Sequence, residues 1–210
     1  MNKYLVELIG TFFLVLTIGC TVISGLEHMA PLAIGTALMV MIYAGGHISG
    51  GHYNPGVTLA CFLRGKCSAA DLIPYWVSQV LGAVLAAFVV KYLYGAPETA
   101  AAAITGDGVG KSLLAEFLFS FAIAWMVLNV ATAKGTEGNS FYGLAIGFTV
   151  LMGAYAVGGI SGGAFNSAVA VGAGLMDLIH MPSIWIHVAA NLVGGVIAAL
   201  AFKSLAGDQG

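Results

Sequence analysis

The sequence contains an internal repeat, and this repeat limits the possible folds more than any other feature. Residues 46–57, GHISGGHYNPGV, recur as residues 158–169, GGISGGAFNSAV, 112 positions later. The same offset aligns Gln79 with Asn191, together with the apolar residues that follow each of them. A motif that returns at a fixed offset indicates two copies of one structural unit in the chain.

Composition places both copies in a membrane. Charged residues make up 8% of the 210 residues and hydrophobic residues 60%, whereas about 25% of the residues in a soluble domain are charged. The net charge of −2 gives no reason to expect a nucleic-acid partner. We therefore expect one integral membrane domain over residues 1–210, with the first copy at about 1–96 and the second at about 110–210.

Six apolar stretches are long enough to cross the hydrocarbon core, which takes about 20 residues of helix. Two further stretches, near 54–63 and 166–175, are too short to span. Each follows a glycine-rich turn, which is typical of a half-helix that enters the membrane and ends there. The sequence thus predicts an all-α membrane fold of six transmembrane helices and two re-entrant half-helices. The predicted spans are residues 4–26, 32–48, 72–94, 112–133, 141–158 and 183–205.

Each copy has three spanning helices, and this odd number determines the topology. The two copies must enter the membrane from opposite sides, related by a pseudo-two-fold axis in the membrane plane, so that the half-helices meet at the midplane. Most Lys and Arg residues lie on one side of this topology, which predicts that both termini are cytoplasmic. These are Lys3, Arg64, Lys66, Lys134 and Lys203, against Lys91 and Lys111 on the other side.

An asparagine begins each half-helix. Asn54 and Asn166 occupy the N-cap position, beside unpaired amide groups and the positive end of the helix dipole. Pro55 suits the first helical position because it has no N–H group to leave unpaired, and Ser167 is an acceptable substitute. Two such N-termini facing each other repel cations and protons and donate hydrogen bonds to a neutral oxygen.

Glycine-rich loops precede both asparagines. At membrane depth, irregular backbone is tolerated only where protein surrounds it or where it lines water. Extended loops here would present carbonyl oxygens to a lumen, as acceptors for a solute that donates hydrogen bonds. The residues predicted to contribute these carbonyls are Gly50, Gly51 and His52 in the first copy and Gly162, Gly163 and Ala164 in the second.

Two glutamates occupy equivalent positions near the starts of two predicted spans. Glu7 and Glu116 are related by an offset of 109. An ionisable residue inside a membrane is a functional candidate. A proton relay is disfavoured, because no chain of His, Asp or Glu continues from either residue. A position at the membrane interface without a specific role stays open as an alternative.

With these motifs the chain resembles the major intrinsic proteins, the aquaporins and aquaglyceroporins, over essentially all 210 residues. The resemblance implies a right-handed helix bundle, a homotetramer with one pore per subunit, and passive conduction of water or small uncharged solutes across the cell membrane. It also implies that Glu7 and Glu116 accept hydrogen bonds from the backbone of the re-entrant loops. We expect no cofactor, no metal and no enzymatic activity.

Three positions depart from the family's pattern. The first signature, Asn-Pro-Ala in the family, is Asn54-Pro55-Gly56 here. The second is Asn166-Ser167-Ala168, so one of the two prolines is missing. The arginine that follows the second signature in the family is Val169 here.

In the family that arginine belongs to a ring of four residues on the extracellular side, which we call the constriction. The resemblance places it at Ile34, Ala154, Gly163 and Val169. None of these has a polar side chain, so we expect a constriction that is wide and apolar and admits glycerol-sized molecules. Two alternatives stay open: a secondary transporter, because inverted repeats also build transporters, and a non-conducting structural membrane protein, suggested by the lost arginine and proline.

Overall fold

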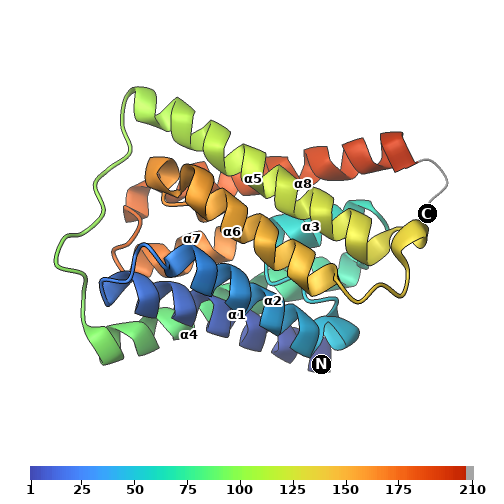
Figure 1. Cartoon of the computed structure of the whole chain (residues 1–210), viewed down its shortest axis with the longest axis horizontal. Helices are drawn as coiled ribbons and strands as arrows, with labels where there is room; N and C mark the ends of the chain where they lie inside the picture. The colour runs from blue at the N-terminus through green and yellow to red at the C-terminus, as the bar shows by residue number, and fades with distance from the viewer. Residues whose placement is uncertain (207–210) are drawn as a thin grey trace.

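The computed structural model describes residues 1–206, and in these residues six long helices surround two short ones (Figure 1). The long helices are α1 (Asn2–Ile23), α2 (Ala30–Ser49), α4 (Ala69–Tyr94), α5 (Asp107–Thr132), α6 (Tyr142–Ser161) and α8 (Ile184–Ala206). The short helices are α3 (Pro55–Leu63) and α7 (Ser167–Leu175), and two 3-10 turns lie at Lys134–Thr136 and Met181–Ser183. The predicted fold class is confirmed, with all six long helices apolar enough to cross a membrane.

Helix boundaries differ from the predicted spans by a few residues, and local chemistry explains the differences. The first helix ends at Ile23 rather than near residue 26, because Gly25 adopts a positive φ of 79° that a helix does not contain. The fourth long helix begins at Asp107 rather than near residue 112. An acidic residue is favourable in the first turn of a helix, so this helix extends past the apolar segment.

Equivalent helices of the two copies pack in equivalent ways. α1 packs against α4 as α5 packs against α8, and α2 crosses α6 between the two copies. Each half-helix packs against the last helix of the other copy, α3 against α8 and α7 against α4. The N-terminus and the end of α8 lie at one end of the bundle, and the connection 95–106 crosses the opposite end (Figure 1). We call these the terminal end and the loop end.

Small residues allow the close approach of the two copies. Gly35 on α2 and Gly147 on α6 are equivalent under the 112-residue offset, and their backbones are in contact. A Cβ atom on Gly35 would lie 2.8 Å from the Gly147 carbonyl oxygen, and one on Gly147 would overlap the Gly35 carbonyl oxygen. Small residues at such crossings are typical of helix packing in lipid, where backbone contact replaces the hydrophobic effect between helices.

Candidate functional site

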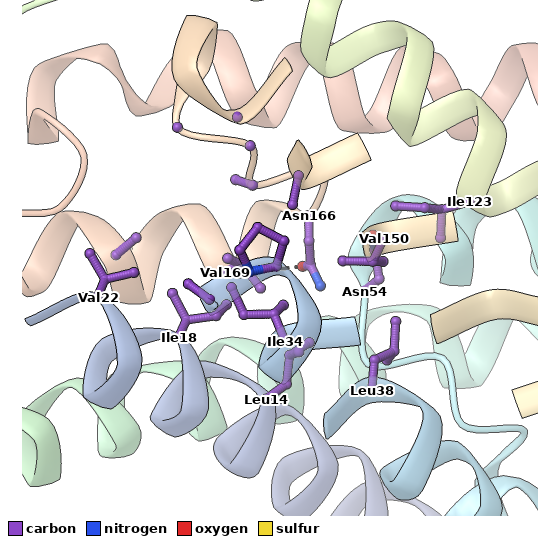
Figure 2. Close-up of a pocket in the computed structure, with 18 of the residues that line it drawn as sticks. Leu14, Ile18, Val22, Ile34, Leu38, Asn54, Ile123, Val150, Asn166 and Val169 are labelled. Carbon is purple, nitrogen blue, oxygen red and sulfur yellow. Dashed lines mark hydrogen bonds between the residues drawn. The ribbon is translucent and has the colours of Figure 1, made fainter. Parts of the chain in front are cut away.

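A cavity of about 350 Å³ lies between the two copies and extends past the N-termini of both half-helices (Figure 2). From the loop end it passes Val22, Ile18 and the pair Ile34 and Val169, then reaches Asn54 and Asn166. Beyond the asparagines its walls include Leu38 and Ile123. Helices from both copies therefore line one lumen, as the inverted repeat predicts.

The side chains that line the cavity are almost entirely apolar. Four polar side chains line it, those of Glu27, His52, Asn54 and Asn166, and the other side chains there are Leu, Ile, Val, Ala and Pro or are absent at Gly. Glu27 is exposed, at the loop end. Hydrogen bonding deep in the lumen therefore depends on two asparagines, one histidine and the backbone.

The two asparagines cap the half-helices and contact each other's loops. The Asn54 Oδ1 atom accepts from the N–H groups of Gly56 and Val57, at 2.9 and 3.4 Å, and the Asn166 Oδ1 atom accepts from Ala168 and Val169, at 3.0 and 3.3 Å. Both carbonyl oxygens are thus turned toward their own helices, which directs both NH₂ groups away from them.

Each amide nitrogen then reaches the opposite loop. The Asn54 Nδ2 atom donates to the Phe165 carbonyl oxygen at 2.9 Å, and the Asn166 Nδ2 atom donates to the Tyr53 carbonyl oxygen at 2.8 Å. An amide nitrogen carries two hydrogens. Both asparagines line the cavity, and within residues 1–206 each Nδ2 atom has one hydrogen-bond acceptor, so one hydrogen of each amide remains without a protein partner.

The residues before the asparagines have an unusual backbone. Tyr53 and Phe165, equivalent under the offset, both adopt a φ of 47°, which is strained by about 1–3 kcal/mol for a residue other than glycine. Both side chains are buried, at 1% and 0% exposure. This conformation turns each carbonyl oxygen toward the asparagine of the opposite loop.

Two buried carboxylates hold these strained residues. Glu7 accepts from the Ser49 hydroxyl at 2.7 Å, the His52 N–H at 2.9 Å and the Tyr53 N–H at 2.7 Å. Both glutamates are at 0% exposure, so each carboxylate faces the interior of the protein. Each carboxylate binds the end of a long helix and the loop that follows it.

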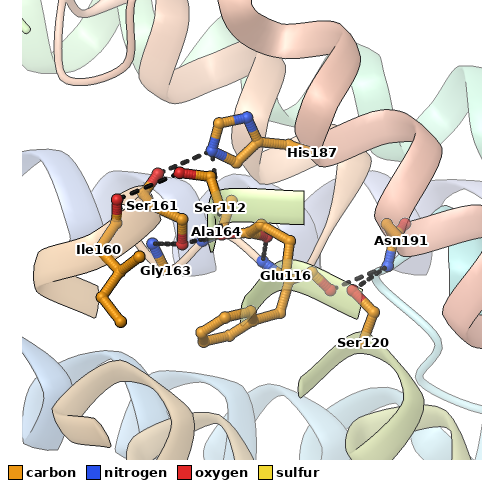
Figure 3. A network of polar contacts seen from close by, with 10 residues as sticks. Ser112, Glu116, Ser120, Ile160, Ser161, Gly163, Ala164, His187 and Asn191 are labelled. Carbon is orange, nitrogen blue, oxygen red and sulfur yellow. Dashed lines mark hydrogen bonds and ion pairs between the residues drawn. The ribbon is translucent and has the colours of Figure 1, made fainter. Parts of the chain in front are cut away.

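The second carboxylate repeats this arrangement (Figure 3). Glu116 accepts from the Ser161 hydroxyl at 2.6 Å, the Ala164 N–H at 3.0 Å and the Phe165 N–H at 2.6 Å. The donors in the two copies are equivalent under the 112-residue offset. The predicted hydrogen bonds from the loop backbone to both glutamates are therefore present.

All four residues of the predicted constriction line the cavity. Ile34 comes from α2, Ala154 from α6, Gly163 from the second loop and Val169 from the first turn of α7. None adds a polar side-chain atom to the lumen.

Four of the six residues predicted to contribute carbonyls line this cavity. These are His52, Gly162, Gly163 and Ala164, whereas Gly50 and Gly51 are not among its lining residues, so their place along the lumen stays a prediction. Gly50 is exposed, as its equivalent Gly162 is, and the His52 ring lies beside it, with the Nε2 atom 3.0 Å from where a Cβ atom on Gly50 would be. The residue equivalent to His52 in the second loop is Ala164, which has no ring.

Comparison with known proteins agrees with this geometry. A family model described as Major intrinsic protein matches residues 1–202. The chain belongs to the major intrinsic protein family.

Its relatives within the major intrinsic proteins include bacterial and plant members. It is 34% identical to "Glycerol uptake facilitator protein-like 6" of Lactiplantibacillus plantarum, with 100% of both chains covered. It is 35% identical to "Aquaporin NIP1-1" of Zea mays, covering 97% of this chain and 74% of the relative. The solved structure of the aquaglyceroporin from Plasmodium falciparum shares the fold, with a TM-score of 0.82, 19% identity, and coverage of 97% of this chain and 96% of that one.

The sequence alone did not indicate every residue of this major intrinsic protein's lumen. Leu14, Ile18 and Val22 of α1 form one wall, but apolar residues of an apolar helix carry no signal that separates lumen from lipid. Asn191 on α8 contacts both half-helices. A signal for it existed, since it is an amide in an apolar span and aligns with Gln79, but the alignment suggested no role.

Proposed function

We propose that this chain forms a passive pore for water and small uncharged solutes, with a constriction wide enough for glycerol-sized molecules. The observation that carries the proposal is the single lumen in which Asn54 and Asn166 present amide donors from opposed half-helix N-termini. Such donors bind a neutral oxygen, and the opposed helix dipoles raise the energy of a cation at the same place.

The constriction sets the size of the solute. Arginine at position 169 would fill part of the lumen and supply five N–H donors, whereas Val169 supplies none. Solutes there have the carbonyl groups of the second loop as hydrogen-bond partners and apolar side chains around them. A solute that carries both hydroxyl groups and a carbon skeleton, as glycerol does, matches this mixture.

The relatives support the same class of solute. One is named for glycerol uptake and another is named an aquaporin, and both are covered over most of their length. We extend the proposal to a homotetramer with one pore per subunit in the cell membrane, with both termini cytoplasmic, as the Lys and Arg distribution favours. Passage through a pore is the activity proposed, with no chemical conversion of the solute.

The test is flux through purified protein in liposomes. Water, glycerol, urea, ammonia and hydrogen peroxide are compared with empty liposomes by stopped-flow light scattering or dye response. The proposal predicts fluxes of water and glycerol that have a low activation energy, saturate poorly and need no gradient of another ion. Flux that requires a second ion would instead indicate a transporter, and absence of flux for every solute would indicate a structural protein.

A further inference from the structure

One buried side chain outside the predicted site joins the N-termini of both half-helices. Asn191, at 1% exposure on α8, faces both Gly56 of α3 and Ser167 of α7. Its Oδ1 atom accepts from the Gly56 N–H at 3.0 Å, the Ser167 N–H at 3.1 Å and the Ser167 hydroxyl at 2.8 Å. A single acceptor thus ties the first turns of two helices from different copies.

The donor half of the same amide acts on the pore asparagine. The Asn191 Nδ2 atom donates to the Asn54 Oδ1 atom at 3.0 Å and to the Phe165 carbonyl oxygen at 2.9 Å. The Phe165 carbonyl is the group to which Asn54 itself donates, also at 2.9 Å. Asn191 therefore contacts both ends of the hydrogen bond that orients the Asn54 amide. Figure 3 shows Asn191 beside Ser120 at the edge of the Glu116 network.

The first copy has no counterpart to this arrangement. Gln79, which aligns with Asn191, donates to Glu7 at 2.8 Å and to Thr58 at 2.9 Å. Within residues 1–206, the hydrogen bonds to the Asn166 Oδ1 atom come from its own helix. The pseudo-two-fold symmetry of the fold therefore does not explain why Asn191 contacts both half-helices.

The missing proline at position 167 explains why an acceptor is needed there. Pro55 begins α3 without an N–H or a hydroxyl, whereas Ser167 begins α7 with both, and these two donors are buried. Both are bound by the Asn191 Oδ1 atom. A buried donor left without a partner is costly, so serine at this position needs an acceptor beside it.

We propose that Asn191 is a positioning residue of the pore, which binds Ser167 and holds the Asn54 amide in place by a hydrogen bond. Through Asn54 it sets solute preference and proton exclusion. This inference rests on the proposed pore function. Asn191 is not among the residues that line the cavity, so it acts on the solute through Asn54 and the half-helix ends.

The test uses full-length protein in liposomes, with water flux, glycerol flux and proton influx measured on the same preparations. The variants are Asn191→Leu, Ser167→Pro and the double variant. Asn129→Leu is the matched control, because Asn129 is also an amide in a spanning helix but donates to Trp125 of its own helix. Asn191→Asp is a second variant of similar size, which keeps acceptors for Ser167 but loses the donors to Asn54 and Phe165.

We expect Asn191→Leu to change the glycerol-to-water flux ratio and the proton influx by about tenfold, because the Asn54 amide loses a buried partner. Asn129→Leu should leave both quantities as in wild type. Ser167→Pro should partly restore the leucine variant, because proline removes the two donors that leucine cannot bind. If Asn191→Leu does not fold, Asn191→Asp is measured instead, and the same tenfold change in flux ratio and proton influx is expected.

The inference is overturned if a folded Asn191→Leu or Asn191→Asp protein keeps the wild-type flux ratio and proton influx, or if Ser167→Pro acts additively with Asn191→Leu. Failure of the proposed function looks different, because wild type itself would then pass neither water nor glycerol.

Discussion

Glu7 accepts the N–H of Tyr53 at 2.7 Å, and Tyr53 is held at a φ of 47° that turns its carbonyl oxygen toward Asn166. Glu116 and Phe165 repeat this relationship at 2.6 Å. Each carboxylate thus stabilises a strained residue whose carbonyl oxygen binds, and so orients, the asparagine of the opposite loop. Because Tyr53 and Phe165 are buried, at 1% and 0% exposure, their N–H groups have no water as an alternative partner.

Replacing either glutamate with glutamine should destabilise the protein. A glutamine side chain has one acceptor oxygen, and its NH₂ group would face backbone donors that the carboxylate now accepts. We expect Glu7→Gln and Glu116→Gln each to lower the free energy of unfolding by about 2 kcal/mol, measured by thermal unfolding in detergent. Glu98→Gln is the control, because Glu98 is exposed in the connection 95–106. Equal stability of all three variants would contradict the support role.

The contact between Gly35 and Gly147 predicts a second stability effect. Gly147→Ala would force a methyl group against the Gly35 carbonyl and the Met39 side chain, so we expect a loss of about 2 kcal/mol. Gly110→Ala is the matched control, since nothing lies within 4 Å of its added Cβ atom. Thermal unfolding of both variants checks the prediction, which fails if Gly147→Ala unfolds at the same temperature as Gly110→Ala.

Charge at the midplane should alter what passes. Asn166→Asp replaces a donor in the lumen with a negative charge beside the helix N-termini, which offsets the barrier to cations. We expect neutral solute flux to fall about tenfold, because the lost donor is worth about 1.4 kcal/mol, and potassium flux to become measurable in liposomes. Asn129→Asp serves as the control. An Asn166→Asp protein that still excludes potassium would show that the dipoles are not the main barrier.

The sequence was sufficient to predict the eight α-helices of residues 1–206 and the half-helix caps, because the relevant signals are local. Apolar length marks the spans, and the glycine-rich turn followed by asparagine marks each half-helix. The residues that line the lumen were harder to predict from the sequence. Gly50 and Gly51, unlike their equivalents Gly162 and Gly163, are not among the residues that line the cavity, a difference that a comparison of two matching glycine pairs cannot show.

Contacts between the two copies were the least predictable part. Asn191 binds Gly56 and Ser167, which lie 135 and 24 positions away. Its importance depends on Ser167 having donors that proline lacks, so it becomes visible only when α8 is placed beside both half-helix ends. Likewise, Tyr53 and Phe165 carry no sequence signal for a positive φ, because the surrounding hydrogen bonds impose it.

The most direct test of the account compares wild type with Val169→Arg and Val169→Leu in liposomes, by stopped-flow measurement of water, glycerol and urea flux. Val169 lines the lumen at the constriction, so arginine should narrow it and leucine should add volume without charge or donors. We predict that wild type passes all three solutes and that Val169→Arg lowers glycerol and urea flux about tenfold while water flux persists, with about 1.4 kcal/mol of added barrier for each tenfold. Val169→Leu should have a smaller effect. A wild type that passes water alone, or an arginine variant with unchanged glycerol flux, would contradict a wide apolar constriction.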